Sequence, residues 1–388
     1  MENSLLSTYP DLKEKLQSSI NEVHDTEYSL KEIELEEIQQ SSPKAKITIQ
    51  VQLVWDDGSD DEELPKKLIL QVPNVQGQSD STDDHAKECN IKDYNREVEF
   101  YALFKGHSEI VFPLPCCYAA ETEGEEEHGI LVLEDLSEHA VFIDDISTGM
   151  TTGQLLNVTA ALANLHSWCL KNSSYWQGKF NSHNAGLLEL RDTMEAGLKQ
   201  MKSQYPDRCA QVDFDFIMEK YTEDNISQWS DKINKSIPQV LTRHELWIDS
   251  LLFRKRSDGT PGDDLVAIVN WEKVGRGSLL EDICSLLSWC TTPEMRRKYE
   301  RIVLVYYRKK LEQGVDGDVQ LPDNDTLWKA YKETFWLRGL MLLGMIPTLL
   351  NTTALNELED EEEKKTIMLE RAIACYEDSI AFFDENDD

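Results

Sequence analysis

The spacing of apolar residues changes once along the chain, near residue 140, and no other feature of the sequence limits the fold as strongly. Before this point, apolar residues alternate in Lys46–Trp55 (KITIQVQLVW) and form short runs at 68–72 and 130–133, as half-buried and buried strands do. The segment 91–104 in this first part has helical spacing. After it, helical spacing recurs at 155–169, 190–235, 281–313, 324–350 and 361–384. The sequence therefore predicts an α+β protein with a strand-rich first part and a larger helical second part.

Two pairs of strands can be anticipated from the turn residues between them. The strands 46–55 and 68–72 flank an acidic turn at 56–63 and are expected to form a hairpin. A second strand-like pair, 246–255 and 265–271, surrounds the turn SDGTPGDD (257–264) within the helical part. A possible helix before Asp25 opens a polar N-terminal segment.

The chain has 388 residues, 40% of them hydrophobic, which suffices for two lobes. We expect a strand-rich lobe with a flexible N-terminal segment at 1–140 and a helical lobe at 141–350. An acidic C-terminal helix and tail are expected at 351–388.

The charge balance excludes one class of partner. With 73 acidic and 39 basic residues, the formal net charge is -34, which repels a nucleic-acid backbone. The same charge describes either a well-solvated surface or an acidic face that docks a basic protein partner.

Features of membrane and secreted proteins are missing from the sequence. The N-terminus lacks the pattern of a signal peptide, and the most apolar run, 337–350, contains Arg338 and is short for a membrane span. The eight cysteines form no C-x-x-C pair, so they are expected to be reduced thiols. These observations predict a cytoplasmic protein without a membrane span.

Seven phrases in order carry a resemblance to a known family. They are LPKKLILQVP (64–73), NREVEFY (95–101), GILVLEDLS (129–137), LANLHSW (162–168), HELWIDSLLF (244–253), LVAIVNWEKVGRGSLLEDI (265–283) and YYRKKLE (306–312). Together they resemble the choline-kinase-like, ecdysteroid-kinase-like family, and especially its nematode-type branch. The resemblance implies a bilobal protein-kinase-like fold of the aminoglycoside/choline kinase type.

Working members of that family transfer a phosphoryl group from ATP to a small hydroxylated substrate, with a strand lysine on the phosphates and a helix glutamate orienting it. The lysine position here is Gln71. Lys67 shares its strand face but lies roughly 13 Å away, at about 3.3 Å per residue, and Lys66 is no better placed. The helix glutamate is Glu97, which is expected to have no ion pair because Gln71 stands opposite.

The catalytic-loop phrase H-G-D-x-W-x-x-N of working relatives reads R-H-E-L-W-I-D-S here. Trp247 sets the register, so Glu245 stands at the general-base position and Ser250 at the magnesium-ligating asparagine. His244 stands at the glycine, or at the histidine if one residue is deleted. The second magnesium ligand, an aspartate in relatives, is Asn270, which carries no charge.

The loop that covers the phosphates in relatives corresponds to EEIQQSSPKAK (36–46), which has no glycine to let backbone amides approach a phosphate. With four elements changed, the resemblance implies a pseudokinase without a cofactor, acting as a binding or regulatory module. The remnant of the nucleotide cleft would consist of Glu97, Leu131, Leu133 and Glu134.

Two other interpretations remain open. In one, the chain is an ATP-dependent small-molecule kinase in which Asp249 and Glu272 hold Mg-ATP in place of the lost ligands. In the other, the vacant cleft binds a small molecule without chemistry.

Several residues are expected to be structural. Trp247 and Trp271 look like packing anchors, and His166 is expected to make a structural hydrogen bond in the helical lobe. Asp282 matches the aspartate that braces the catalytic loop in relatives, although a helix cap or a surface charge explains it equally well.

Overall fold

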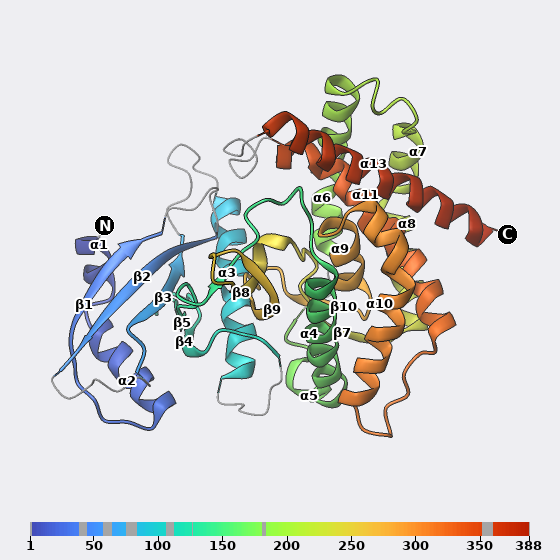
Figure 1. Ribbon diagram of the computed structural model, residues 1–388. Coiled ribbons are helices and arrows are strands. Elements are labelled where there is room, and N and C mark those ends of the chain that lie inside the picture. The colour runs from blue at the N-terminus through green and yellow to red at the C-terminus, as the bar shows by residue number, and fades with distance from the viewer. Residues whose placement is uncertain are drawn as a thin grey trace. The chain divides into compact units, whose positions relative to one another are not determined.

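The computed structural model describes residues 2–38, 45–56, 64–74, 84–105, 112–125, 127–180, 184–350 and 360–387 (Figure 1). They belong to two compact units. The first comprises Met1–Ile110, Leu114–Ala140 and Ala267–Lys273, and the second comprises Val111–Pro113, Val141–Val266 and Val274–Asp388. Ala267–Lys273 belongs to the first unit although it lies far beyond residue 140 in the sequence. The spacing of hydrophobic residues does not reveal which unit such a short segment joins.

A five-stranded antiparallel sheet forms the framework of the first unit. Its order is β1-β2-β3-β5-β4, from β1 (Leu30–Glu37), β2 (Lys46–Trp55), β3 (Lys67–Pro73), β5 (Ile130–Glu134) and β4 (Cys117–Glu121). The pairing of β2 with β3 confirms the predicted hairpin, whose acidic turn at 57–63 lies outside the described residues. Strand β1 is not anticipated by the sequence analysis, because lysine and glutamate surround its few apolar residues. It is an edge strand with exposed charges, which discourage pairing with other chains.

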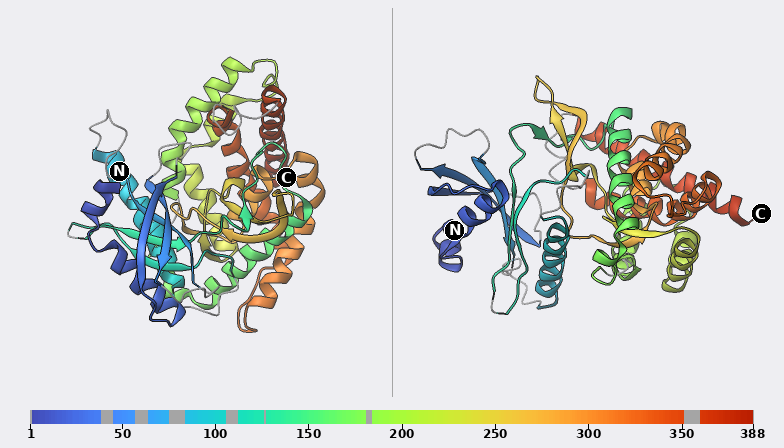
Figure 2. Two further views of the ribbon diagram at one scale, coloured as in Figure 1. Left: turned by 60° about the vertical axis from the view of Figure 1, so that its left-hand side comes forward. Right: turned by 90° about the horizontal axis from the view of Figure 1, so that it is seen from below.

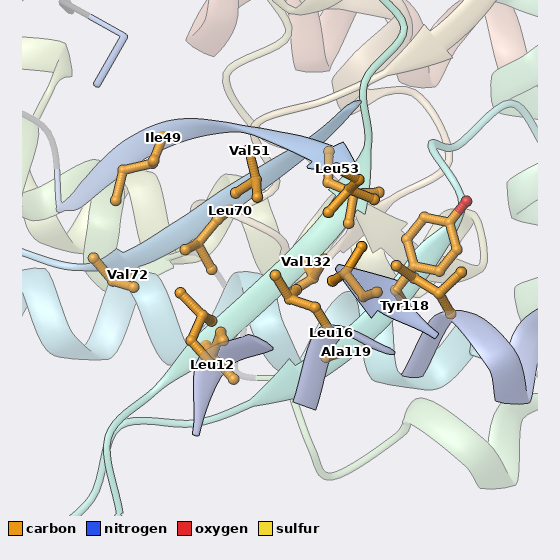
Figure 3. Packing of buried hydrophobic residues seen from close by; sticks show 14 of the residues in the cluster. Leu12, Leu16, Ile49, Val51, Leu53, Leu70, Val72, Tyr118, Ala119 and Val132 are labelled. Atoms are coloured by element: carbon orange, nitrogen blue, oxygen red, sulfur yellow. The ribbon is translucent and has the colours of Figure 1, made fainter. Parts of the chain in front are cut away.

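One face of the sheet packs against the N-terminal helices α1 (Glu2–Thr8) and α2 (Leu12–His24). The predicted opening helix corresponds to α2, whose Leu12, Leu16 and Ile20 are at most 1% exposed. Figure 3 shows these leucines directed at the alternate residues of the strands, among them Ile49, Leu70 and Val132. Period-two alternation therefore places the apolar half of each strand under α2.

The other face of the sheet packs against α3 (Asp84–Phe104), the helix predicted at 91–104. Figure 2 shows α2 and α3 on opposite sides of the sheet. Tyr94, Val98 and Tyr101 of α3 are at most 1% exposed. The Tyr94 hydroxyl donates to the carbonyl of Gln71 at 3.3 Å. Gln71 of β3, on the face away from α2, is therefore buried beside α3.

Helices make up most of the second unit. They are α4 (Thr152–Lys171), α5 (Ser173–Trp176), α6 (Asn184–Gln204), α7 (Phe214–Lys220), α8 (Glu223–Ser236), α9 (Glu281–Trp289), α10 (Pro293–Gly314), α11 (Asn324–Leu350) and α13 (Glu361–Asp387). The predicted stripe from Leu155 to Cys169 is the buried face of α4. Thr151 and Gln154 begin this helix with a reciprocal capping box.

Short strands carry the loops of the second unit. Strand β7 (Gln239–Thr242) pairs with β10 (Gly275–Ser278), and β8 (Leu251–Lys255) lies between β6 (Ala140–Val141) and β9 (Pro261–Ile268). The predicted pair within the helical part is confirmed as β8 and β9. Its first half is shorter than predicted, because residues 246–250 form a loop and the 3-10 helix η1 (Ile248–Ser250).

The C-terminal helix α13 belongs to the second unit. Arg371, which is 1% exposed, donates to the carbonyls of Ile146, Ser147 and Trp289. A buried cation that satisfies three carbonyls fixes this helix firmly in place.

Candidate functional site

The first unit contains a buried ion pair that contradicts one expectation. Lys46, at the start of β2, makes a short contact through its Nζ with Oε2 of Glu97 on α3, and these side chains are 2% and 1% exposed. The prediction that Glu97 has no ion pair is therefore wrong. The lysine comes from the strand next to the one where relatives carry it.

The register of the hairpin explains why Lys46 reaches Glu97. Thr48 pairs with Gln71, and Lys46 pairs with Pro73, so Lys46 is the diagonal neighbour of Gln71 on the face toward α3. Diagonal neighbours lie roughly 7–8 Å apart, within the reach of a lysine side chain. Gln71 is 7% exposed, and its Oε1 has no hydrogen-bond partner among the described residues. Lys46 of β2, rather than a residue of β3, is therefore the buried cation beside Glu97.

A second carboxylate shares this cation. Oε2 of Glu272 lies 3.5 Å from Nζ of Lys46, and the backbone N–H of Trp271 donates to the other oxygen of Glu97 at 3.0 Å. Burial lowers the pKa of Lys46, but Glu97 and Glu272 raise it by more, so the pKa lies above its ordinary value. Lys46 is therefore a charged lysine whose field is offset by two acidic side chains.

The segment around Asn270 is held against α3 by several contacts. The ring of Trp271 stacks on Phe100 with centroids 4.0 Å apart, which confirms Trp271 as a packing anchor. Arg96 donates to the carbonyl of Glu272 at 2.8 Å. Asn270 has a φ of 63°, in the left-handed region that asparagine tolerates better than most residues. The uncharged Asn270 therefore occupies a left-handed turn in a segment that packs against α3.

The remaining residues expected in the remnant cleft lie on β5. Leu131 pairs with Gln71 and is fully buried, and Leu133 is 4% exposed. The carboxylate of Glu134 accepts the backbone N–H of Cys116 at 3.2 Å. Leu131 and Leu133 therefore belong to the core around the strand, and Glu134 caps the end of the strand. Residues 39–44, where the glycine-free loop was predicted, lie outside the described residues.

In the second unit, Asp282 of α9 braces the loop that follows β7. Its carboxylate accepts the backbone N–H groups of Arg243 (2.8 Å) and His244 (3.0 Å), and its side chain is fully buried. The bracing role is confirmed over that of a surface charge. His244 has a φ of 65°, a conformation that favours glycine, which agrees with its alignment to the glycine of relatives.

Beneath this loop lies a buried ionic cluster that the sequence analysis does not anticipate. Oε2 of Glu281 contacts Nδ1 of His244 at 2.7 Å and the guanidinium of Arg338, which is 2% exposed. Burial raises the pKa of Glu281, but Arg338 and His244 outweigh it and hold the pKa far below its usual range. Glu281 is therefore ionised and ties α11 to the loop.

The residues of the predicted catalytic loop differ in how exposed they are to solvent. Glu245 is half-buried, whereas Asp249 is exposed. Ser250 is fully buried, and its hydroxyl donates to the carbonyl of Trp247 at 2.6 Å. Trp247 lies against Trp289 with ring centroids 4.4 Å apart, as expected of a packing anchor. Ser250 thus completes the turn of its own loop.

His166 of α4 makes the structural contact that was predicted. Its Nδ1 lies 2.5 Å from the hydroxyl of Tyr307, and the ring is fully buried. Burial lowers its pKa to about 3. A folded pKa of about 3 against about 6.5 unfolded means that the unfolded chain binds the extra proton, so stability is lost as the pH falls below 6.5.

Between pH 8 and pH 5, protonation of His166 in the unfolded chain is expected to lower the free energy of unfolding by about 2 kcal/mol. This follows from a slope of about 1.4 kcal/mol per pH unit below about pH 6.5. Urea unfolding at pH 8 and pH 5 measures it: in His166→Gln, the drop in unfolding free energy between the two pH values should be about 2 kcal/mol smaller than in the natural protein. The matched control is the same substitution at the exposed His139. Equal pH dependence in all three proteins would contradict the assignment.

Sheet order, the helix after the third strand, the lysine–glutamate pair and the braced loop together define a kinase-like fold. The family model DUF1679, described as "Uncharacterized oxidoreductase dhs-27", matches residues 5–387, and the chain belongs to this family.

Two curated relatives are from Caenorhabditis elegans. "Uncharacterized oxidoreductase dhs-27" is 27% identical over 270 residues, which cover 66% of this chain and 32% of that protein. "Uncharacterized kinase-like protein D1044.1" is 24% identical over 251 residues, which cover 62% of this chain and 63% of that protein. The chain thus spans about a third of the first relative and less than two thirds of the second.

Solved structures of small-molecule kinases are also similar. Choline kinase from Cryptosporidium parvum Iowa II is 12% identical, with 91% of this chain and 89% of that chain covered and a TM-score of 0.47. Aminoglycoside 2'-phosphotransferase-IIIa, in its GDP complex, is 12% identical, with 92% and 96% covered and a TM-score of 0.45.

Within the described residues, every helix is too short or too polar to cross a membrane.

Proposed function

We propose that this chain is a catalytically inactive member of the kinase-like fold, a pseudokinase that acts as a binding or regulatory module. The observation that carries the proposal is the state of the two metal-ligand positions. Ser250 uses its hydroxyl within its own loop, and Asn270 provides no negative charge. Magnesium is normally held in such sites by at least one carboxylate together with substrate phosphates. The choline/ecdysteroid-kinase-like branch and a cytoplasmic location belong to the same proposal and rest on the sequence.

The charge around Lys46 supports the same conclusion. A lysine serves a nucleotide by offering net positive charge to its phosphates. Here Glu97 and Glu272 both lie within 4 Å of Nζ, so one cation faces two carboxylates. The charge of Lys46 is therefore already paired within the protein, which leaves less of it for a phosphate.

A second candidate function, an ATP-dependent small-molecule kinase, is favoured by one observation. The Lys46–Glu97 pair provides the cation that Gln71 lacks. The bracing of the loop by Asp282 and the carboxylate of Glu245 are also kept. In this version Glu272 would have to leave Lys46 when magnesium and nucleotide bind.

Calorimetric titration with MgATP and a sensitive assay for ADP formation distinguish the two functions. We expect the natural protein to form no more ADP than its Glu245→Gln variant, which serves as the matched control. The triple variant Glu245→Asp, Ser250→Asn, Asn270→Asp, which leaves Lys46 and Glu97 in place, should gain magnesium-dependent ATP binding. Magnesium-dependent ADP formation by the natural protein, abolished in Glu245→Gln, would establish the kinase instead.

A further inference from the structure

The outward face of α10 carries an unusual stripe, formed by Lys298, Ile302, Val305 and Lys309, which we call the α10 stripe. The spacings of four, three and four residues align these side chains along one face over about 16 Å, at about 1.5 Å per residue. Ile302 and Val305 are 54% and 51% exposed, whereas the other exposed aliphatic side chains among the described residues reach at most 40%. Figure 1 shows α10 beside α4 in the helical unit.

Folding of the unit does not explain the two aliphatic residues. The inward face of α10 is already provided by Val303, Leu304, Tyr307 and Leu311, which are at most 3% exposed. Helix propensity does not explain them either, because β-branched residues are poorer helix formers than the lysine and glutamate used elsewhere on this helix. Ile302 and Val305 thus form a small exposed apolar patch that the packing of this unit does not require.

Exposed lysines flank the two aliphatic residues of the α10 stripe. The sequence of α10 contains seven lysine and arginine residues against three glutamates, in a chain whose net charge is -34. Arg296 and Arg297 pair with acidic residues of α13, and Arg308 pairs with Glu312, so the exposed basic charge beside the stripe comes from its lysines. Beside the stripe, Lys298 lies over the ring of Tyr299 and Lys310 over that of Tyr306, with Nζ 5.0 and 5.5 Å from the ring centroids. The result is a basic, partly aromatic border around two exposed aliphatic residues.

We propose that the α10 stripe binds an amphipathic helix of a partner protein that presents aliphatic side chains between acidic ones. Aliphatic residues at spacings of three and four would pack against Ile302 and Val305 as ridges into grooves. Acidic residues at both ends would face Lys298 and Lys309. This inference does not depend on whether the chain transfers phosphoryl groups.

Charge and the extent of the stripe select this occupant over two others. In a symmetric pairing of two α10 helices, Lys298 would face Lys309 when antiparallel and Lys298 when parallel, so like charges would oppose in either case. A membrane surface is disfavoured because a stripe only two aliphatic residues long provides little area for insertion.

Fluorescence anisotropy with the full chain tests the inference. The probe is a labelled synthetic helix of about 15–20 residues with leucines at i, i+3, i+4 and i+7 flanked by glutamates. The reference probe has the same composition with its leucines dispersed around the helix. We expect the patterned helix to bind at least about tenfold more tightly, and raising the salt concentration to weaken it.

Two pairs of substitutions locate the binding. Lys298→Glu/Lys309→Glu and Ile302→Ser/Val305→Ser should each weaken the patterned helix at least about tenfold, which corresponds to about 1.4 kcal/mol. The control, Lys31→Glu/Lys66→Glu, makes the same change in net charge at exposed sites on the first unit and should have less than about a twofold effect.

Three results would overturn the proposal. One is equal affinity for the patterned and dispersed helices, or binding that neither substituted pair weakens. Another is concentration-dependent self-association in sedimentation that Ile302→Ser/Val305→Ser abolishes, which would make a second copy the occupant. The last is flotation with anionic phosphatidylserine vesicles that requires Lys298 and Lys309, which would assign the stripe to a membrane.

Discussion

Replacing Lys46 with methionine is expected to destabilise the first unit by about 3–5 kcal/mol, the usual cost of removing one partner from a buried ion pair. The carboxylate of Glu97, whose side chain is 1% exposed, would remain buried without its cation, and Glu272 would add repulsion. Urea unfolding followed by tryptophan fluorescence, to which the buried Trp271 beside α3 contributes as one of nine tryptophans, measures the change.

Removing the uncompensated charge should reverse much of this loss. The double variant Lys46→Met/Glu97→Gln is expected to be more stable than Lys46→Met alone, because a neutral amide replaces the stranded carboxylate. Lys31→Met, at an exposed position of β1, is the matched lysine control and should change stability by less than about 0.5 kcal/mol. A loss of under about 1 kcal/mol in Lys46→Met would mean that the pair is not formed in solution.

Replacing Asp282 with alanine is expected to destabilise the second unit by about 2–6 kcal/mol, since two buried backbone N–H groups lose their acceptor at about 1–3 kcal/mol each. These are the amides of Arg243 and His244, and His244 also holds a backbone conformation that few residues adopt readily. Hydrogen exchange at both amides should accelerate in parallel with the loss of stability.

The size of this effect should depend on pH. Burial raises the pKa of Asp282 to about 6, although the backbone amide of Arg243 opposes the rise. A folded pKa above the unfolded value of about 3.9 means that the folded state binds the extra proton, so the stabilisation from protonation is lost as the pH rises through 6. The cost of Asp282→Ala should therefore be about 1.4 kcal/mol larger at pH 5 than at pH 8. The opposite pH trend would contradict the brace as described.

The sequence by itself determined the type and order of most elements. Alternation in KITIQVQLVW indicates burial on one face of a strand, and this segment is β2. Helical spacing from Leu155 to Cys169 indicates burial on one face of a helix, and this segment lies in α4. It also determined the kinase-like fold, and it aligned His244 with a glycine position that the positive φ of that residue supports. Strand β1 escaped detection because an edge strand needs little apolar surface, and charged residues dominate its pattern.

Only the tertiary structure decided which lysine meets Glu97. Lys46 and Glu97 are 51 residues apart, and their contact depends on the register of β2 against β3 and on the face of the sheet that α3 covers. A shift of one residue in that register would turn Lys46 toward α2, and nothing local in the sequence specifies it. The cluster of Glu281, His244 and Arg338 has the same origin, because a buried charge selects its partners by proximity in space. Local pattern fixes the elements, whereas the pairing of buried charges depends on how those elements are packed.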